Sequence, residues 1–350
     1  MNDIFNHLFV LELANNHWGS LSRGKRIVRE FAKIVKKHNV KAAIKLQFRD
    51  VDTFIHKNFK KSENKNYSRY INKTIDTKLS NNDLEKLLIY IKKHGCVTMS
   101  TPFDENSVDF CNQLNVDIIK IASSDINDWI LIKKIASTKK PVIISTGGAS
   151  EIQIENVVSY FKNRNIPISI NHCVSNYPCE DDELELDQID FLINKYPDCI
   201  IGLSTHEYHD WHSSMLISYA KGVRTWERHI DIPYKEGEQQ KEVSLYCSTP
   251  DQIDEWFTYY KKAVSMCGTS KTERRIVSKK EDIYLQALYR GLYLKRDLSA
   301  NSVVTIDDLY SAVPYQPEIN QFTSRTFIEG DYILKNTLKK DDPLTFNDIQ

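Results

Sequence analysis

Short apolar runs alternate with amphipathic segments along most of this chain, and this alternation is the feature that most constrains its fold. Eight of these runs predict β-strands, at 8–16, 41–48, 96–103, 117–125, 141–148, 167–178, 199–206 and 223–230. Apolar residues spaced three and four apart predict helices between them, for example at 24–39, 81–95, 106–115 and 151–165. Alternating strands and helices favour parallel strands with crossover helices. Eight such units in roughly 270 residues match the size of a (β/α)₈, or TIM, barrel.

A doubly wound open sheet is the rival architecture, but it usually needs a glycine-rich turn after its first strand. That turn here is "ELANNHWGS", which is not G-x-G-x-x-G. The strand–helix rhythm stops near residue 268, and short β-rich pieces with turns follow. We therefore predict an α/β chain with a barrel at 1–268, a linker at 269–284 and a small β-rich domain at 285–350.

The charge balance and the cysteines narrow the class of protein. Lys+Arg and Asp+Glu both number 47, so the formal net charge is zero, which argues against a dedicated nucleic-acid or membrane-surface binder. We find neither a signal-peptide pattern nor an apolar run long enough to span a membrane. The seven cysteines form no C-x-x-C pair, as expected for a cytoplasmic protein with free thiols.

Each predicted strand begins apolar and ends polar. In a TIM barrel the carboxyl ends of all strands meet at one face, and that face carries the active site. The polar residues at these ends are Glu12, Asn15, Asn16, Lys45, Gln47, Ser100, Thr101, Lys120, Ser123, Ser145, Thr146, His172, Ser175, Asn176, Ser204, His206, Glu227 and His229. A single polar strand end is commonly a satisfied core or loop group, but eight together predict an active site.

Two lysines in this set suggest how the site binds its ligand. Lys45 and Lys120, with hydroxyl groups from Ser123, Ser145 and Ser204, suit a clamp for phosphate and carboxylate groups. A Schiff-base role for Lys120 is the alternative, because buried lysines shift toward neutrality. Glu12 is the carboxylate expected to handle a proton or water, and its alternative role is that of an ion-pair partner for one lysine.

Two histidines end neighbouring predicted strands, His206 on the seventh and His229 on the eighth. Adjacent strands lie about 5 Å apart, so the two imidazoles could share a divalent metal such as Mn²⁺, Zn²⁺, Fe²⁺ or Co²⁺. A core or general-base role for either histidine is the alternative. His209 and His212 follow the strand end and are expected in a loop or helix.

Eight motifs in order resemble those of the sialic acid synthase family: "ELANNHWGS", "AAIKLQF", "MSTPFDENSVDF", "IKIASSDI", "PVIISTGGAS", "HCVSNYP", "IGLSTH" and "ERH". "RGLYLKRDLSANSVVTIDDL" resembles the antifreeze-like (SAF) domain that follows the barrel in that family. The resemblance implies condensation of phosphoenolpyruvate (PEP) with an open-chain N-acyl amino sugar, giving a sialic acid-like nonulosonic acid and phosphate. It also implies a homodimer in which each SAF domain lies over the partner's barrel.

The resemblance assigns roles residue by residue. Glu12, His206 and His229 would be catalytic, and the two histidines would hold the metal, with Mn²⁺ expected and Mg²⁺, Co²⁺ or Zn²⁺ as alternatives. The residues implied for PEP are Lys45, Lys120, Ser123, Ser145, Ser175, Asn176 and Ser204. Those implied for the sugar are Gln47, Asp125, Tyr177 and Arg290, the last reaching from the partner subunit.

The motifs implied to bind the sugar depart from the family pattern, so the sequence does not identify the acceptor sugar. Asp125 stands where the family has a glutamate, and Thr205 stands where the family has an aspartate. The family motif "GPDHKAS" is replaced near "EGEQQKEVS", where Glu238, Gln239 or Gln240 would stand in for its aspartate. Two other functions remain as alternatives: a lysine Schiff-base aldolase on the same barrel, and a non-catalytic sugar- or PEP-binding protein.

Overall fold

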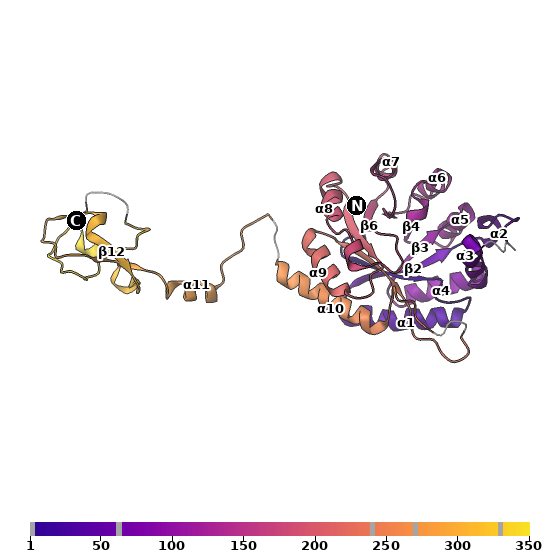
Figure 1. Ribbon diagram of the computed structural model, residues 1–350, viewed down its shortest axis with the longest axis horizontal. Helices are drawn as coiled ribbons and strands as arrows, with labels where there is room; N and C mark the ends of the chain where they lie inside the picture. The colour runs from indigo at the N-terminus through magenta and orange to yellow at the C-terminus, as the bar shows by residue number, and fades with distance from the viewer. Residues whose placement is uncertain (1–3, 61–64, 239–241, 269–271, 328–331) are drawn as a thin grey trace. The chain divides into compact units, whose positions relative to one another are not determined.

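The computed structural model describes residues 4–60, 65–238, 242–268, 272–327 and 332–350. The chain divides into two compact units, Met1–Thr269 and Ser270–Gln350. The first unit is a closed barrel of parallel strands surrounded by helices (Figure 1). The predicted TIM barrel is therefore confirmed, and the open doubly wound sheet is excluded.

The barrel closes because β1 pairs in parallel with both β2 and β8. Each strand pairs with the next along the chain, and the short β9 (Cys247–Ser248) adds to the end of β8. The barrel strands are β1 (Leu8–Ala14), β2 (Lys41–Phe48), β3 (Val97–Pro102), β4 (Ile118–Ile121), β5 (Val142–Ser145), β6 (Ile168–Cys173), β7 (Ile200–Thr205) and β8 (Thr225–Ile230). Seven of the eight strands are shorter than predicted: for example, Ser123–Asp125 forms a 3₁₀ turn after β4, and β6 ends at Cys173.

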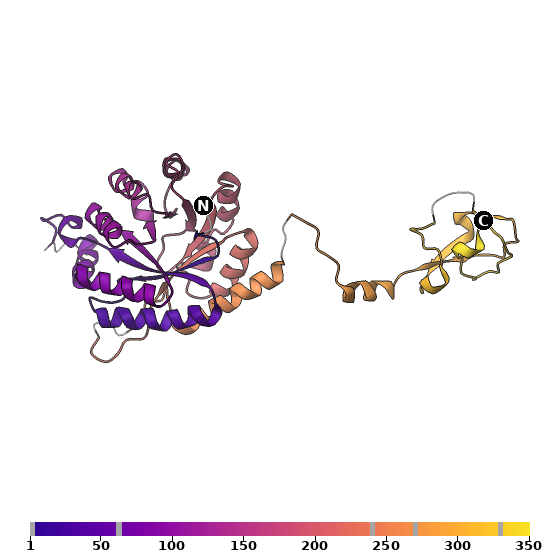
Figure 2. The same cartoon turned by 180° about the vertical axis from the view of Figure 1, so that it is seen from behind.

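Helices follow the strands and cover the outside of the barrel (Figure 2). They are α1 (Leu21–His38), α2 (Val51–Phe54), α3 (Lys65–Asp76), α4 (Asn81–Lys93), α5 (Glu105–Gln113), α6 (Trp129–Ser137), α7 (Glu151–Lys162), α8 (Gln188–Lys195), α9 (Trp211–Lys221) and α10 (Pro250–Cys267). Many of these helices begin at a polar N-cap residue. At the start of α1, for example, the Ser20 side chain accepts a hydrogen bond from the Arg23 amide. The second and third helices follow β2 in the chain and pack together through a small apolar cluster that includes Val51 and Ile71.

Side chains alternate between two apolar layers along each strand. Outward residues such as Phe9 and Leu11 pack under the helices, whereas inward residues such as Leu8, Val10 and Met99 fill the lower part of the barrel. On β1 the inward series Leu8, Val10 continues to Glu12. The same face therefore changes from apolar to charged toward the carboxyl end of the strand.

The second unit has its own small apolar core, which includes Leu294, Phe322 and Leu344. Its helix is α11 (Lys279–Gln286), and its strands are β10 (Gly291–Leu294), β11 (Val303–Val304), β12 (Leu309–Ala312) and β13 (Tyr332–Ile333). They pair as two antiparallel ladders, β10 with β12 and β11 with β13. Among the described helices of the whole chain, none is both long and apolar enough to cross a membrane.

Candidate active site

A cavity of about 460 Å³ opens at the carboxyl ends of the barrel strands. It brings together side chains from all eight barrel strands and from the loops after them. The predicted site residues that line it are Glu12, Lys45, Gln47, Lys120, Ser123, Ser145, Tyr177, Ser204, His206 and His229. The polar strand ends thus converge on one cavity, as a barrel predicts.

Two lysines and two glutamates form a buried ion cluster at the bottom of this cavity. The Lys45 ammonium contacts Glu12 Oε2 and lies 3.0 Å from Glu227 Oε1. Lys120 Nζ lies 2.7 Å from Glu227 Oε2. All four side chains are almost fully buried, so Glu227 bridges two ammonium groups that would otherwise repel each other in a low-dielectric site.

Burial and neighbouring charges act in opposite directions on these groups. Burial raises the pKa of Glu227, but Lys120 and Lys45 outweigh burial and hold that pKa at about 2. Burial also raises the pKa of Glu12, and there the nearby Lys45 offsets it only in part. Burial lowers the pKa of Lys120, although the Glu227 carboxylate favours its charged form. Glu227 is therefore the permanent anion of the cluster, and Glu12 is the carboxyl group better suited to exchange a proton.

The two predicted metal ligands lie close together. The imidazole centroids of His206 and His229 are 5.5 Å apart, and both rings line the cavity. The Val174 carbonyl accepts a hydrogen bond from His206 Nδ1 at 3.0 Å, so the lone pair of that ring is left on Nε2. Burial lowers the pKa of His206 to about 4, and burial together with His206 lowers the pKa of His229 well below its ordinary value.

Neutral imidazoles with one nitrogen free are the form that binds metals, so this pair fits a divalent ion. In the described part of the chain, no three His, Cys, Asp or Glu side chains gather into a ready-made metal site. The remaining ligands of an ion at this pair would therefore be water or substrate oxygens. His209 and His212 lie elsewhere, the first near Glu180 and the second bonded to Glu255 on α10.

Serine hydroxyl groups form another part of the cavity lining. Ser123, Ser145 and Ser204 line the cavity. Ser175 lies beside Ser123, because a β-carbon built on Gly147 would be 2.1 Å from Ser175 Oγ and 2.8 Å from Ser123 Oγ. The absence of a β-carbon at Gly147 leaves room for both hydroxyls, and a larger residue there would displace them. Asn176 points elsewhere, since its amide donates to Glu183 at 3.0 Å on the surface.

The residues expected on the sugar side are more scattered. Tyr177 packs over His206 with ring centroids 3.9 Å apart, and Gln47 lines the cavity. Asp125 does not line it; burial raises the pKa of this carboxyl group to about 6, and its Oδ2 atom has no hydrogen-bond partner. Arg290 belongs to the second unit, where it is exposed just before β10.

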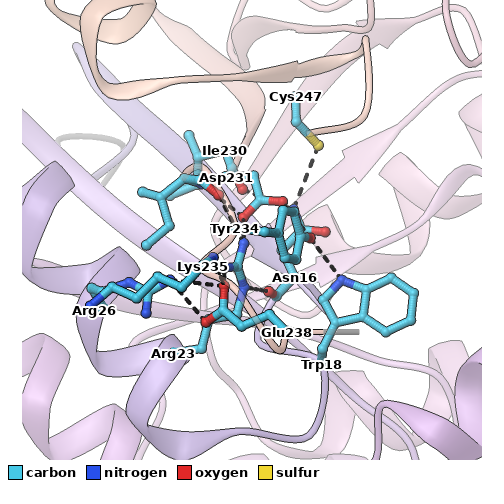
Figure 3. Close-up of polar contacts among 11 residues, drawn as sticks. Asn16, Trp18, Arg23, Arg26, Ile230, Asp231, Tyr234, Lys235, Glu238 and Cys247 are labelled. Carbon is cyan, nitrogen blue, oxygen red and sulfur yellow. Dashed lines mark hydrogen bonds and ion pairs between the residues drawn. The ribbon is translucent and has the colours of Figure 1, made fainter. Parts of the chain in front are cut away.

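The segment between β8 and β9 replaces the family's acidic motif, and its carboxylates are engaged with α1. Figure 3 shows the Arg23 guanidinium bonded to Asp231 Oδ1 at 2.6 Å and to Glu238 Oε2 at 2.7 Å. Arg23 also donates to the Asn16 carbonyl at 2.7 Å and lies 3.6 Å from the centre of the Tyr234 ring. Glu238 therefore has no contact with the cavity, and Gln239 and Gln240 lie outside the described residues.

This network joins two loops that end at the cavity. Asn16, from the loop after β1, donates to the Ile230 carbonyl at 2.8 Å and lines the cavity (Figure 3). Trp18 donates to the Tyr234 hydroxyl at 2.8 Å, and that hydroxyl donates to Asp231 Oδ2 at 2.8 Å. Arg23 thus fixes the two loops against each other.

Sequence reasoning missed several cavity residues. Glu227 was recognised as a polar strand end but was given no role, although its position two residues before His229 places both side chains on the same inward face. Arg49, Tyr70, Lys73 and Tyr246 also line the cavity. They come from loops and from α3, where no strand periodicity indicates which way a side chain points.

The fold and the cavity define the class: a TIM-barrel enzyme whose charged residues meet at the carboxyl ends of its strands. The model of the NeuB family matches residues 34–272. The chain belongs to the NeuB family, which confirms the resemblance to sialic acid synthases.

This chain is similar to proteins of known structure and to proteins compared by sequence alone. A crystal structure named for spore coat polysaccharide biosynthesis protein E from Chromobacterium violaceum is 33% identical, covers 98% of this chain and 99% of its own, and has a TM-score of 0.88. The N-acetylneuraminic acid (sialic acid) synthetase from Leptospira borgpetersenii, in complex with citrate, is 26% identical over 79% of this chain and 90% of its own, with a TM-score of 0.67. The N,N'-diacetyllegionaminic acid synthase of Campylobacter jejuni is 26% identical over 269 residues, 71% of this chain and 75% of the relative.

Proposed function

We propose that the protein condenses PEP with the open-chain aldehyde of an N-acyl amino sugar, giving a nonulosonic acid and phosphate. The observation that carries this conclusion is the Lys45–Glu227–Lys120 cluster at the bottom of the cavity in a NeuB-family barrel. Similar proteins whose names state an activity include synthases of sialic and legionaminic acids. The function is thus supported by the family and by a site built to bind a small anion.

PEP carries a carboxylate and a phosphate on one small molecule, and the cluster offers two ammonium groups. Lys45 and Lys120 would take these two groups, with Ser123, Ser145 and Ser204 donating hydrogen bonds from the wall. Ser175 and Asn176 are the remaining members of the proposed PEP set, and Asn176 would join it by exchanging its bond to Glu183 for one to PEP. Fixed cations in a buried site stabilise the developing charge on a phosphoryl leaving group more strongly than water does. The ionised Glu227 keeps both lysines in their charged form.

The reaction forms one C–C bond and breaks one C–O bond. Carbon 3 of PEP attacks the aldehyde carbon, and its electron pair makes the new bond while positive charge develops at carbon 2. Water adds at carbon 2, and the tetrahedral intermediate then expels phosphate by C–O cleavage. Glu12 is the group proposed to accept the proton of that water, because burial raises the pKa of this carboxyl group above its ordinary value. Its Oε1 is held in place by the Ala14 amide at 2.7 Å.

His206 and His229 are the proposed metal ligands. A divalent ion bound there would polarise the aldehyde as a Lewis acid. Mn²⁺ is the ion we propose, with Mg²⁺, Co²⁺ and Zn²⁺ as alternatives, because imidazole together with oxygen ligands suits such borderline ions. The Val174 carbonyl fixes the tautomer of His206, which orients its free nitrogen.

The remaining assignments are proposed on the resemblance. Gln47, Asp125 and Tyr177 would contact the sugar. The domain boundaries 1–268, 269–284 and 285–350 would separate the barrel, a linker and an antifreeze-like SAF domain. In a homodimer, Arg290 would reach the acceptor bound in the partner's barrel. A cytoplasmic location is proposed from the seven free cysteines, which form no disulfide in the structure.

The test is phosphate release from PEP with Mn²⁺ across a panel of aldoses and N-acyl amino sugars, with the product identified by mass. We expect release with a restricted set of acceptors and a new 2-keto-3-deoxy acid. Lys120→Met should abolish release, and Lys120→Arg should retain part of it, because the charge is kept. Trapping of Lys120 by borohydride with pyruvate would instead support the aldolase. PEP binding without turnover of any acceptor would support the non-catalytic alternative.

A further inference from the structure

Two cations near the mouth of the cavity have no anionic partner among the described residues. Arg49 and Lys73 line the same cavity as Lys45 and Lys120. The two inner lysines are bonded to Glu12 and Glu227, whereas neither outer cation forms an ion pair with any described residue. The cavity lining thus holds four cations and two carboxylates, and the excess positive charge lies at the mouth.

Arg49 is held in place without being neutralised. Its guanidinium carbon lies 3.8 Å from the centre of the Phe103 ring, with Phe54 at 5.6 Å and Tyr70 at 5.8 Å. Aromatic faces position a guanidinium and leave its N–H edge available for a planar anion. The Nε atom is buried and has no hydrogen-bond partner. A buried donor without a partner is costly, and a ligand oxygen would satisfy it.

Three acidic residues in this part of the barrel do not balance this charge. Asp231 and Glu238 are bonded to Arg23 and do not line the cavity (Figure 3). Asp125 lies within electrostatic range of Arg49, yet no hydrogen bond joins the two side chains in the described structure. The positive charge at the mouth is therefore open to a ligand.

The position of Arg49 separates it from the proposed PEP site. Lys45, Gln47 and Arg49 all line the cavity, and Arg49 directly follows the last residue of β2. Four residues of extended chain place the Arg49 backbone about 13 Å beyond that of Lys45, toward the mouth. With PEP on the inner lysines, the group that meets Arg49 belongs to the other substrate.

We propose that the acceptor sugar carries an oxyanion, a phosphate ester or a carboxylate, that binds Arg49 and Lys73 at the cavity mouth. This inference rests on the proposed condensation, and it names the chemical class of its second substrate. Arg49 would bind two oxygens of the anion through its N–H edge, and Lys73 would act as a point charge. Neutral N-acyl amino sugars would lack these contacts.

The experiment compares three matched acceptors at fixed PEP and Mn²⁺: a neutral N-acyl amino hexose, its 6-phosphate and the corresponding 6-carboxylate. Charge-assisted hydrogen bonds predict a kcat/KM about 10- to 100-fold higher for one of the charged acceptors. Comparing the 6-phosphate with the 6-carboxylate identifies the anion. Equal kcat/KM for all three acceptors would overturn the inference and leave the condensation intact, whereas no phosphate release with any of them would overturn both.

Variants then locate the site. Arg49→Met should lower the kcat/KM of the charged acceptor about 10- to 100-fold with an unchanged KM for PEP, and Arg49→Lys should recover part of it. Lys73→Met should have a smaller effect in the same direction. Lys78→Met is the matched control, since Lys78 is exposed just after α3 and does not line the main cavity. A raised KM for PEP in Arg49→Met, or an equal loss in Lys78→Met, would overturn the assignment.

Discussion

Removing the Arg23 guanidinium should destabilise the barrel far more than removing its neighbour Arg26. Both side chains bind Glu238, so the pair forms a matched comparison. Arg23 and Asp231 are 2% and 1% exposed, whereas Arg26 and Glu238 are 18% and 22% exposed. In Arg23→Met the Asp231 carboxylate stays buried without its cation. Breaking a buried pair in this way costs about 3–5 kcal/mol.

The control has a much smaller expected effect. Arg26→Met removes a partly exposed pair worth about 0–1 kcal/mol, and Glu238 keeps its bond to Arg23. For a domain of this size, each kcal/mol lost from the free energy of unfolding lowers the midpoint of thermal unfolding, Tm, by about 2–4 °C. Arg23→Met should therefore lower Tm by roughly 6–20 °C. Thermal unfolding gives the Tm of both variants, and urea unfolding gives their free energies of unfolding.

A double variant tests the cause of this loss. Asp231→Asn in the Arg23→Met background removes the unpaired charge and should recover part of the stability. Equal losses in Arg23→Met and Arg26→Met, or no recovery in the double variant, would refute the reasoning.

Two further changes have clear expected outcomes. Gly147→Ala should raise the KM for PEP, because the new methyl would lie 2.1 Å from Ser175 Oγ; an unchanged KM in steady-state kinetics would contradict this. Burial raises the pKa of Asp125 from 3.8 to about 6, with Asp128 raising it and Arg49 lowering it. The folded state thus binds this proton more tightly, so stability should fall as pH rises from about 4 to about 6. Asp125→Asn should remove that fall in urea unfolding, and an unaltered pH profile would count against it.

The barrel and the inner half of the cavity could be predicted because both follow strand periodicity. Lys45 and Lys120 are inward residues at strand ends, and alternation along a strand determines which face a side chain is on. Glu227 follows the same rule, but its role depends on contacts with Lys45 and Lys120 from two other strands, which no local pattern indicates.

The outer half of the cavity could not be predicted in the same way. Tyr70 and Lys73 come from α3, and Tyr246 comes from the segment after β8, where tertiary packing decides the direction of each side chain. The bonds that hold Glu238 to α1 join residues more than 200 positions apart, and no local pattern indicates such a pairing. The opposite case is Asn176, which the motif predicts in the site. In the structure its side chain is bonded to Glu183 instead.

The inward face of the barrel divides into an apolar lower layer and a charged upper layer, and this division bears on how the enzyme can change over evolutionary time. The residues that form the apolar layer, such as Leu8 and Met99, are not the residues that line the cavity. The cluster around Glu227 sits on strands, whereas Arg49 and Lys73 sit on a loop and an added helix. Substitutions at the rim can therefore retarget the enzyme to a new sugar while its reaction with PEP and its thermal tolerance are inherited unchanged.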